Sequence, residues 1–296
     1  MAVHSAVFSP WRVPFIAVLA GCVIPDLPWI VRRLVDASSF SVEPISTYAY
    51  FIAQSSLVGC FFACIAFAFL FRNFKVVAAY ALLGSLVHLL LDSLQDKWGV
   101  GVHLLAPFNW EALRLGVFQV DSVFTHLLTV AGIIPFLFIT KARHDARLLC
   151  LNTYRIAGCC VCIIAYFSVP LLFISHVVAS DSRYLHTLEN KDERRGKLLE
   201  LDRETTSVTG DTWHTTTHIG EVLAILNPDA NMKDGGTYSF KAEFDNEHEI
   251  WVTDWKRHSG ARDTASYVGL LLIGCWVASV LILGRRTKSV VTDKAS

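Results

Sequence analysis

The sequence predicts an α-helical polytopic membrane protein with a small β-rich domain inserted before its last helix. Hydrophobic residues make up 53% of the 296 residues and charged residues only 18%, and the mean hydropathy is +0.44, a balance outside the usual soluble range. Several apolar stretches approach the ~20 residues that cross a bilayer. Charge is concentrated instead between residues 180 and 264. We therefore expect a helical membrane domain over residues 1–179, an insert over 180–264, and a final span with a basic tail over 265–296.

Six apolar stretches set the expected number of transmembrane helices at about six. They are residues 13–31, 47–71, 75–94, 120–140, 154–179 and 265–284. The first stretch is the least regular, because Pro25 and Pro28 remove backbone donors and should bend or break the helix there. It also contains Leu19-Ala20-Gly21-Cys22, a sequence found at lipoprotein processing sites. The prolines before it are unusual in such a signal, so we expect residues 1–21 to remain in the mature protein.

The orientation follows from basic residues in short loops, which are retained on the cytoplasmic side. Lys and Arg cluster at residues 72–75, 141–155 and 285–288. This alternation predicts cytoplasmic termini and an extracytoplasmic insert, in a multi-pass protein of the bacterial inner membrane. Arg32 and Arg33 depart from the pattern, because the same topology places them on the outer side.

The charge balance and the missing motifs narrow the classes of function. The formal net charge is zero, so no basic surface predicts a nucleic-acid partner. The eight cysteines lie in or beside apolar stretches, as small packing residues do, and no two C-x-x-C motifs face each other as in a zinc ribbon. A Gly-x-Ser-x-Gly elbow and a P-loop are also missing from the sequence. Serine-hydrolase and nucleotide-driven mechanisms therefore have no motif to support them.

The insert has the pattern of a small β domain. It holds 17 acidic and 11 basic residues. Residues 181–203 are permissive for helix, whereas Thr237–Phe244 and Glu249–Trp255 alternate as strands do. Turn sequences such as Gly210-Asp211 separate these segments. Four or five short strands predict a small barrel or sandwich, and we favour an OB-like barrel.

The charge and position of the insert bear on its partners. An acidic domain outside the cytoplasm suits an envelope oligosaccharide, a lipid headgroup or a protein better than DNA. His214 and His218 have the spacing of a metal pair on a helix. Their Thr-rich surroundings favour a strand, along which four residues span about 13 Å. We therefore expect surface or structural histidines there.

The residues with the clearest chemistry are His88 and Asp92, near the outer end of the 75–94 stretch. Residues at i and i+4 share one helix face, so both could hold one metal ion or one proton-transfer site. The alternative is a hydrogen bond that ties helices together. Ionisable groups inside a span are costly and tend to mark functional sites, which favours function.

Asp26 is expected at the same depth, at the break in the first stretch. It would bring a second carboxylate to His88 and Asp92, and a site of this kind could be catalytic. Asp26 also suits the cap of a helix that begins at Leu27 or Pro28, and both roles are compatible. The sequence thus predicts Asp26, His88 and Asp92 as catalytic residues.

These motifs resemble a known family. Pro25-Asp26, His88-x-x-x-Asp92 and the stretch from Gly101 to Phe108 are similar to the bacterial membrane-bound metal-dependent hydrolases, over about residues 1–110. The resemblance implies a divalent metal, zinc or manganese, and a histidine before the Pro-Asp motif, which His4 matches. It implies metal ligation by His4, Asp26, His88 and Asp92.

Two features of that family are missing. Asp26 is followed by Leu27-Pro28-Trp29, where the family has a second aspartate or a histidine, and no His-Arg-x-x-Thr-His motif occurs between residues 30 and 80. Gln54-Ser55-Ser56 lies near the expected place and offers weaker ligands. His126, five residues after Asp121, could complete the metal set.

His103 and His176 lie at a similar depth to this set, but each alone fits an interfacial or core histidine better. The expected function is a membrane-embedded hydrolase in which a metal-bound water attacks a membrane-associated, lipid-linked phosphoryl or acyl ester. The main alternative is a non-enzymatic envelope protein whose insert binds a glycan or a protein partner. A transporter is a third hypothesis, because intramembrane carboxylates and histidines also relay protons.

Overall fold

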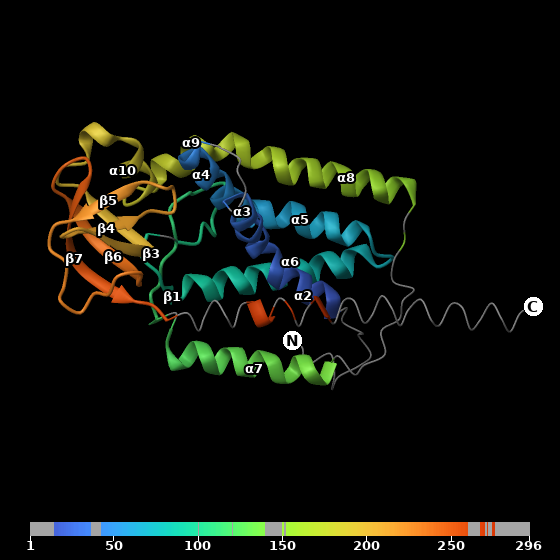
Figure 1. The fold of residues 1–296 in the computed structure, drawn as a ribbon. Helices are drawn as coiled ribbons and strands as arrows, with labels where there is room; N and C mark the ends of the chain where they lie inside the picture. The colour runs from blue at the N-terminus through green and yellow to red at the C-terminus, as the bar shows by residue number, and fades with distance from the viewer. Residues whose placement is uncertain are drawn as a thin grey trace, which may run out of the picture.

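The chain folds into a helical body with a β-barrel at one end (Figure 1). This computed structural model describes residues 15–36, 43–99, 101–119, 121–139, 150, 152–259, 267–269, 271 and 274–275. The prediction of a partly helical, partly β protein is confirmed. Helices α5, α6 and α8 pack side by side, and the barrel lies beyond their ends (Figure 1).

The first apolar stretch is broken where the prolines predict. Helix α2 (Phe15–Val23) gives way to the single 3-10 turn η1 (Ile24–Asp26), and α3 (Leu27–Asp36) follows directly. Pro25 occupies an early position of the 3-10 turn, where its missing N–H is tolerated. The stretch is therefore two short helices joined at Asp26 rather than one continuous span.

The second stretch is also divided, at a place that hydropathy does not mark. Helices α4 (Pro44–Ser55) and α5 (Leu57–Phe69) meet at an angle of 60°. Ser56 between them has extended backbone angles, φ −68° and ψ 171°, which end α4. Glu43 caps the start of α4 and accepts hydrogen bonds from the backbone N–H groups of Ile45 and Ser46, at 3.0 and 2.5 Å.

Two helical segments of the described residues are long and apolar enough to cross a membrane. They are α6 (Phe74–Ser93) and Thr153–Ser180, which comprises α8 (Thr153–Ser168), η3 (Val169–Phe173) and α9 (Ile174–Ser180). The bent α4–α5 pair raises the number to three if it is one span. Helix α7 (Val123–Ile139) has a shorter apolar part within the described residues, Val123–Gly132.

The expected number of about six spans is not supported by this structure. Apolar composition continues across breaks such as Ser56 and Pro25, so counting apolar stretches counts bent pairs and paired short helices as spans. The predicted 265–284 span lies largely outside the described residues. Two to three candidate spans are consistent with a membrane protein.

The insert contains a closed five-stranded barrel, preceded by α10 (Leu185–Glu189) and η4 (Lys191–Glu193). Its strands are β3 (Leu198–Thr209), β4 (Thr212–Thr216), β5 (Val222–Ile225), β6 (Thr237–Phe244) and β7 (Glu249–Arg257). The order around the barrel is β3-β4-β5-β7-β6, with β6 pairing back to β3 and β5 parallel to β7. The two predicted strands that begin at Thr237 and Glu249 are confirmed. The helix-permissive interpretation of residues 181–203 is wrong from Leu198 onward, because β3 begins there.

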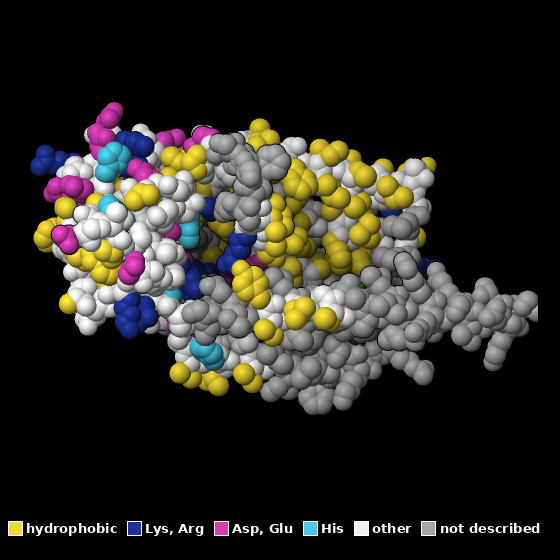
Figure 2. Space-filling view, in the orientation of Figure 1, with side chains coloured by type: hydrophobic (Ala, Val, Ile, Leu, Met, Phe, Trp, Pro, Cys, Tyr) yellow, Lys and Arg dark blue, Asp and Glu magenta, His cyan; other side chains and the backbone are white. Residues whose placement is uncertain are grey.

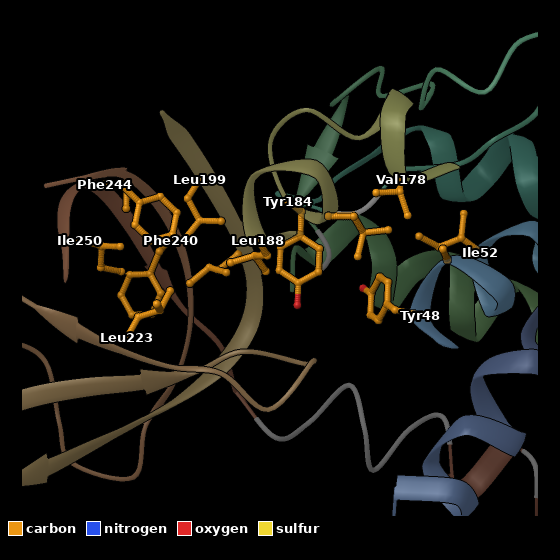
Figure 3. Packing of buried hydrophobic residues seen from close by; sticks show 14 of the residues in the cluster. Tyr48, Ile52, Val178, Tyr184, Leu188, Leu199, Leu223, Phe240, Phe244 and Ile250 are labelled. Carbon is orange, nitrogen blue, oxygen red and sulfur yellow. The ribbon is translucent and has the colours of Figure 1, made fainter. Parts of the chain in front are cut away.

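The barrel is packed onto the helical body through one continuous apolar core. Inside the barrel lie Leu199, Leu223, Phe240, Phe244 and Ile250, which Figure 3 shows extending toward the helices. Leu188 and Tyr184 continue the cluster, followed by Tyr48 and Ile52 of α4 and Val178 of α9 (Figure 3). Burial of this shared apolar surface fixes the end of the helical body against the barrel.

Candidate functional site

Two glycines set the distance between α2 and α6. A Cβ atom added to Gly21 would lie 2.1 Å from the carbonyl oxygen of Ala81, and one added to Gly84 would lie 2.8 Å from that of Val18. The hydroxyl of Ser85 donates to the carbonyl oxygen of Gly21 at 2.8 Å. Small residues at such a crossing let two helix backbones approach closely. The crossing brings the end of α2 beside the last turns of α6.

His88 lies between the two predicted carboxylates. Its Nε2 atom is 3.5 Å from Oδ1 of Asp26 and 3.8 Å from Oδ2 of Asp92. Asp92 and His88 share one face of α6, as the i, i+4 spacing predicts, and Asp26 comes from the break between α2 and α3. The structure therefore brings Asp26, His88 and Asp92 together. The 3.5 and 3.8 Å separations are longer than good hydrogen bonds, so the three groups face one another without being tightly bonded.

Residues after α6 complete the polar end of this group. Nζ of Lys97 lies 3.2 Å from Oδ2 of Asp92, and Nε2 of Gln95 donates to Oδ1 of the same carboxylate at 3.2 Å. Gln95 belongs to the two-residue strand β1 (Gln95–Asp96), which pairs with β2 (Phe118–Gln119). The chain between β1 and β2 folds back over the end of α6.

A cavity of about 1040 Å³ lies beside His88, between the helical body and the barrel. Helices α2, α3, α4 and α6 and the turn between α2 and α3 contribute residues that include Asp26, Tyr48, His88 and Asp92. The other walls are the segment after β1 and one side of the barrel. In Figure 2, a hollow between the barrel and the apolar helical surface shows Lys, Arg, Asp, Glu and His side chains.

The barrel wall of the cavity contains a bulge in β3. Leu201 pairs with Phe240 and Glu204 with Tyr238, so β3 has one residue more than β6 between these pairs. Arg203, in the bulge, has φ 60°, a left-handed conformation that costs free energy for a residue other than glycine. Asp202 and Arg203 both line the cavity. Bulges often redirect side chains next to functional sites.

A second polar group joins the bulge to the start of α7. The hydroxyl of Ser239 lies 2.8 Å from Nε2 of His258 and donates to Asp202 at 2.8 Å, and Nδ1 of His258 is 2.9 Å from Oδ2 of Asp121. The order Ser, His, Asp is that of a hydrolase triad. Ser239 is only 2% exposed, however, and its oxygen also accepts the N–H of Arg203. We therefore interpret this group as a structural link that holds the bulge.

Among the described residues, the other candidate ligands do not join His88. His126 is exposed on α7, its Nδ1 lies 2.8 Å from the carbonyl oxygen of Ser122, and it does not line the cavity. His4 lies outside the described residues. Asp121 contacts His258 instead.

The two further histidines and Gln54 have structural surroundings. His103 lines the cavity, bonds the carbonyl oxygen of Trp110 at 2.7 Å, and is neutral because burial lowers its pKa to about 4. His176 is exposed beside Phe173. Gln54 is buried and donates to the hydroxyl of Tyr50 at 3.2 Å. The expected strand is confirmed for His214, which belongs to β4, but not for His218, which lies in the turn after this strand.

The metal hypothesis is weakened by the donors that the structure places here. Among the described residues there is no group of three or more His, Cys, Asp or Glu side chains arranged to hold a metal ion. A catalytic zinc takes three protein ligands, and the Lys97 ammonium beside Asp92 adds positive charge where a cation would sit. Asp26, His88 and Asp92 therefore do not fit a catalytic metal by themselves.

Sequence reasoning missed the basic side chains around the cavity. Lys97, Arg114 and Arg203 line it together with Arg32 and Arg33. Only the last two gave a signal, because they break the positive-inside pattern. The others lie in segments whose fold the sequence did not predict. Comparison of the chain with protein-family models, curated proteins and solved structures finds no match.

Proposed function

We propose that the protein is a membrane-embedded hydrolase of a membrane-associated phosphoryl or acyl ester, with Asp26, His88 and Asp92 as its catalytic residues. The observation that carries the proposal is the position of His88 Nε2, between two carboxylates and on the wall of a large cavity. The resemblance of the first ~110 residues to membrane-bound hydrolases adds to it. An imidazole beside carboxylates is a common general acid–base arrangement.

In this mechanism His88 takes a proton from the attacking water and later returns it to the leaving alcohol. Asp26 and Asp92 both face Nε2 of the imidazole, orient the ring and stabilise its positive charge, so Nδ1 is the atom that exchanges the proton. Lys97, 3.2 Å from Asp92, holds that carboxylate in place. The ester bond is cut between the attacked atom and the alcohol oxygen.

The divalent metal implied by the family resemblance, zinc or manganese, would need a ligand in addition to the described residues. His4 is the candidate that the sequence offers. If bound, the metal would acidify a water and polarise the ester. Elemental analysis of purified protein beside His4→Ala and His88→Ala tests this part. Metal that is absent from the wild type after incubation with zinc or manganese would restrict the mechanism to the chain's own residues.

We further propose a multi-pass topology in the bacterial inner membrane, with an extracytoplasmic OB-like insert. The basic clusters of the short loops support this orientation. The five-stranded closed order β3-β4-β5-β7-β6 supports the OB-like assignment. Accessibility of single cysteines introduced at Asp211 and at Lys288 to a membrane-impermeant thiol reagent tests the topology, in a background where the eight native cysteines are replaced. Labelling of both from the same side would contradict it.

Screening of the purified protein against lipid-linked phosphoryl and acyl esters tests the reaction. Asp26→Asn and Asp92→Asn should each lower turnover strongly while the protein remains monodisperse. His126→Ala is the matched control, because this exposed histidine lies on α7 and away from the cavity. Turnover that persists in both carboxylate variants would overturn the assignment of the site.

A binding role without catalysis is the alternative, with the insert recognising an envelope glycan or a protein. Trp251 on β7 favours it, because this large aromatic side chain is 54% exposed on the outside of the barrel. Exposed tryptophans are common anchors in binding surfaces. Loss of glycan or protein binding in Trp251→Ala, with full binding in His88→Ala, would support this role over hydrolysis.

A further inference from the structure

The cavity beside His88 has more cationic than anionic side chains on its walls. Five lysine and arginine side chains line it, against three aspartates. The cations are Arg32, Arg33, Lys97, Arg114 and Arg203, and the aspartates are Asp26, Asp92 and Asp202. The lining side chains therefore carry an excess of positive charge, which favours an anionic ligand.

Three of the arginines come from two separate parts of the fold. Arg32 and Arg33 belong to α3, and Arg203 belongs to the bulge of β3. The guanidinium of Arg32 lies over the ring of Tyr48 at 4.2 Å and donates to the carbonyl oxygen of His218 at 2.5 Å. The helical and the barrel wall are thus joined at this point, with arginines on both sides.

Arg114 lines the same cavity and has a buried donor without a partner in the described part of the chain. Its Nε atom is buried and has no hydrogen-bond partner among the described residues, although its Nη1 atom pairs with Glu200. A buried N–H without an acceptor destabilises the fold. Such a group usually indicates a missing water, ion or ligand with acceptor atoms.

Other residues that line the cavity are apolar. Leu19, Val23 and Ile30 contribute from α2 and α3, and Ile52 contributes from α4. The segment that supplies Arg114 also carries Phe108, which is 97% exposed. Figure 2 shows the polar hollow beside the apolar surface of the helices. The cavity therefore offers charge to one end of a ligand and hydrocarbon to the other.

We propose that the cavity binds an amphiphile through a phosphoryl headgroup, held by Arg32, Arg33 and Arg203, with its chains against α2, α3 and α4. This inference rests on the proposed function and names its substrate class, a phosphoryl rather than an acyl ester. Guanidinium groups match phosphate oxygens in geometry and charge. The two arginines retained on the outer side against the topology rule then have a role in binding.

Binding of short-chain phosphatidic acid to the full-length protein in detergent tests the proposal. Arg33→Gln and Arg203→Gln should each weaken binding about tenfold to a hundredfold, and Arg195→Gln should leave it unchanged, because Arg195 is exposed and does not line the cavity. Diacylglycerol with the same chains should bind far more weakly. Equal affinity for both lipids, or wild-type affinity in all three variants, would overturn the proposal.

Two additional measurements distinguish free phosphate from a phospholipid as the ligand, and binding from hydrolysis. Competition by inorganic phosphate would show that the headgroup suffices for binding, whereas its failure together with tight phosphatidic acid binding would show that the chains are needed. His88→Ala should still bind phosphatidic acid but should no longer hydrolyse it. Lipid that binds but is never hydrolysed would remove the proposed function and keep the binding site. His88-dependent hydrolysis of a neutral acyl ester, without phosphatidic acid binding, would keep the proposed function and remove the phosphoryl binding site.

Discussion

Arg194 in the barrel domain has a hydrogen-bond acceptor for every donor, whereas His88 at the end of the helical body has its charged neighbours at longer distances. In the barrel domain, Arg194 is fully buried, and its five N–H donors all have acceptors. Two go to the carboxylate of Glu221 at 2.6 and 2.8 Å, and the others go to backbone oxygens of Thr187, Leu188 and Glu247. By contrast, His88 has carboxylate oxygens at 3.5 and 3.8 Å.

The difference indicates what each set of charges does. A buried charge with every donor bonded contributes to the stability of one fold, and breaking it is costly. Ionisable groups that face one another across a cavity at longer distances can instead exchange protons or accept a ligand. Arg194 therefore stabilises the fold, and His88 is available for chemistry. The following substitutions test these two roles.

The largest effect is expected for His88→Asn. Loss of a general acid–base group lowers turnover by about 10²–10⁴-fold, and the melting temperature should change little because both carboxylates lie beyond the distance of a good hydrogen bond. Turnover of the lipid-linked ester and thermal unfolding of the same preparation measure both. An inactive variant that is also strongly destabilised would show that His88, like Arg194, stabilises the fold.

Arg194→Met should give the opposite result. Removing the guanidinium leaves the Glu221 carboxylate and three backbone oxygens without their donor, which should cost about 3–5 kcal/mol of unfolding free energy. Urea unfolding, monitored by tryptophan fluorescence, measures this loss of unfolding free energy. Arg195→Met is the control, because this neighbouring arginine is exposed. A loss of stability no larger than that of the control would contradict the structural role.

Gly84→Val should affect both properties to an intermediate degree. The new side chain would collide with the backbone of α2, since even a Cβ atom would lie 2.8 Å from the carbonyl oxygen of Val18. Overpacking of this kind costs about 1–3 kcal/mol and should also move Asp26 away from His88 and lower turnover. Gly132→Val is the control, because a Cβ atom added there would have no neighbouring atom within 4 Å. Unchanged turnover in Gly84→Val would show that the helix crossing does not position the site.

Substitution of Glu204 should give the smallest change in unfolding free energy over any one pH unit, visible as a pH dependence of stability. Burial raises its pKa to about 8 from an ordinary value of 4.5, so the folded protein holds this proton more tightly than the unfolded chain does. The free energy of unfolding should therefore fall as pH rises from about 4.5 to 8. Glu204→Gln should remove this slope, which is on the order of 1 kcal/mol per pH unit.

The measurement for Glu204 is thermal unfolding at several pH values within that window. The Gln side chain retains an acceptor for the backbone N–H of His218, which Glu204 accepts at 2.9 Å. The variant should therefore match the wild type at low pH and exceed it at high pH. A variant with the same slope as the wild type would show that Glu204 is already ionised in the folded protein.

Local pattern predicted several elements of the fold well. Strand alternation located β6 at Thr237–Phe244, a segment whose outer residues alternate between buried and exposed positions. The i, i+4 rule placed His88 and Asp92 on one face, and the prolines located the break at Pro25. Each of these depends on residues that are close in sequence, for which composition and spacing are sufficient.

Long-range features were not accessible in the same way. Ser56 divides α4 from α5 although the hydropathy is continuous across it. The pairing of Asp121 with His258 joins residues 137 positions apart. Arg203 reaches the cavity through a bulge whose register depends on the partner strand. These features arise from tertiary packing, and a single sequence does not encode them in any local period.

The extra residue in β3 bears on how the two halves of the chain can be separated experimentally. Excision of the whole barrel would also open one wall of the cavity, so a null phenotype from such a truncation could not distinguish a lost binding domain from a lost catalytic chamber. Deletion of Arg203 alone would bring β3 and β6 to equal length between their flanking pairs, leaving the domain in place. That single-residue deletion, rather than truncation, alters the barrel wall of the cavity while keeping the apolar core that joins the barrel to the helices.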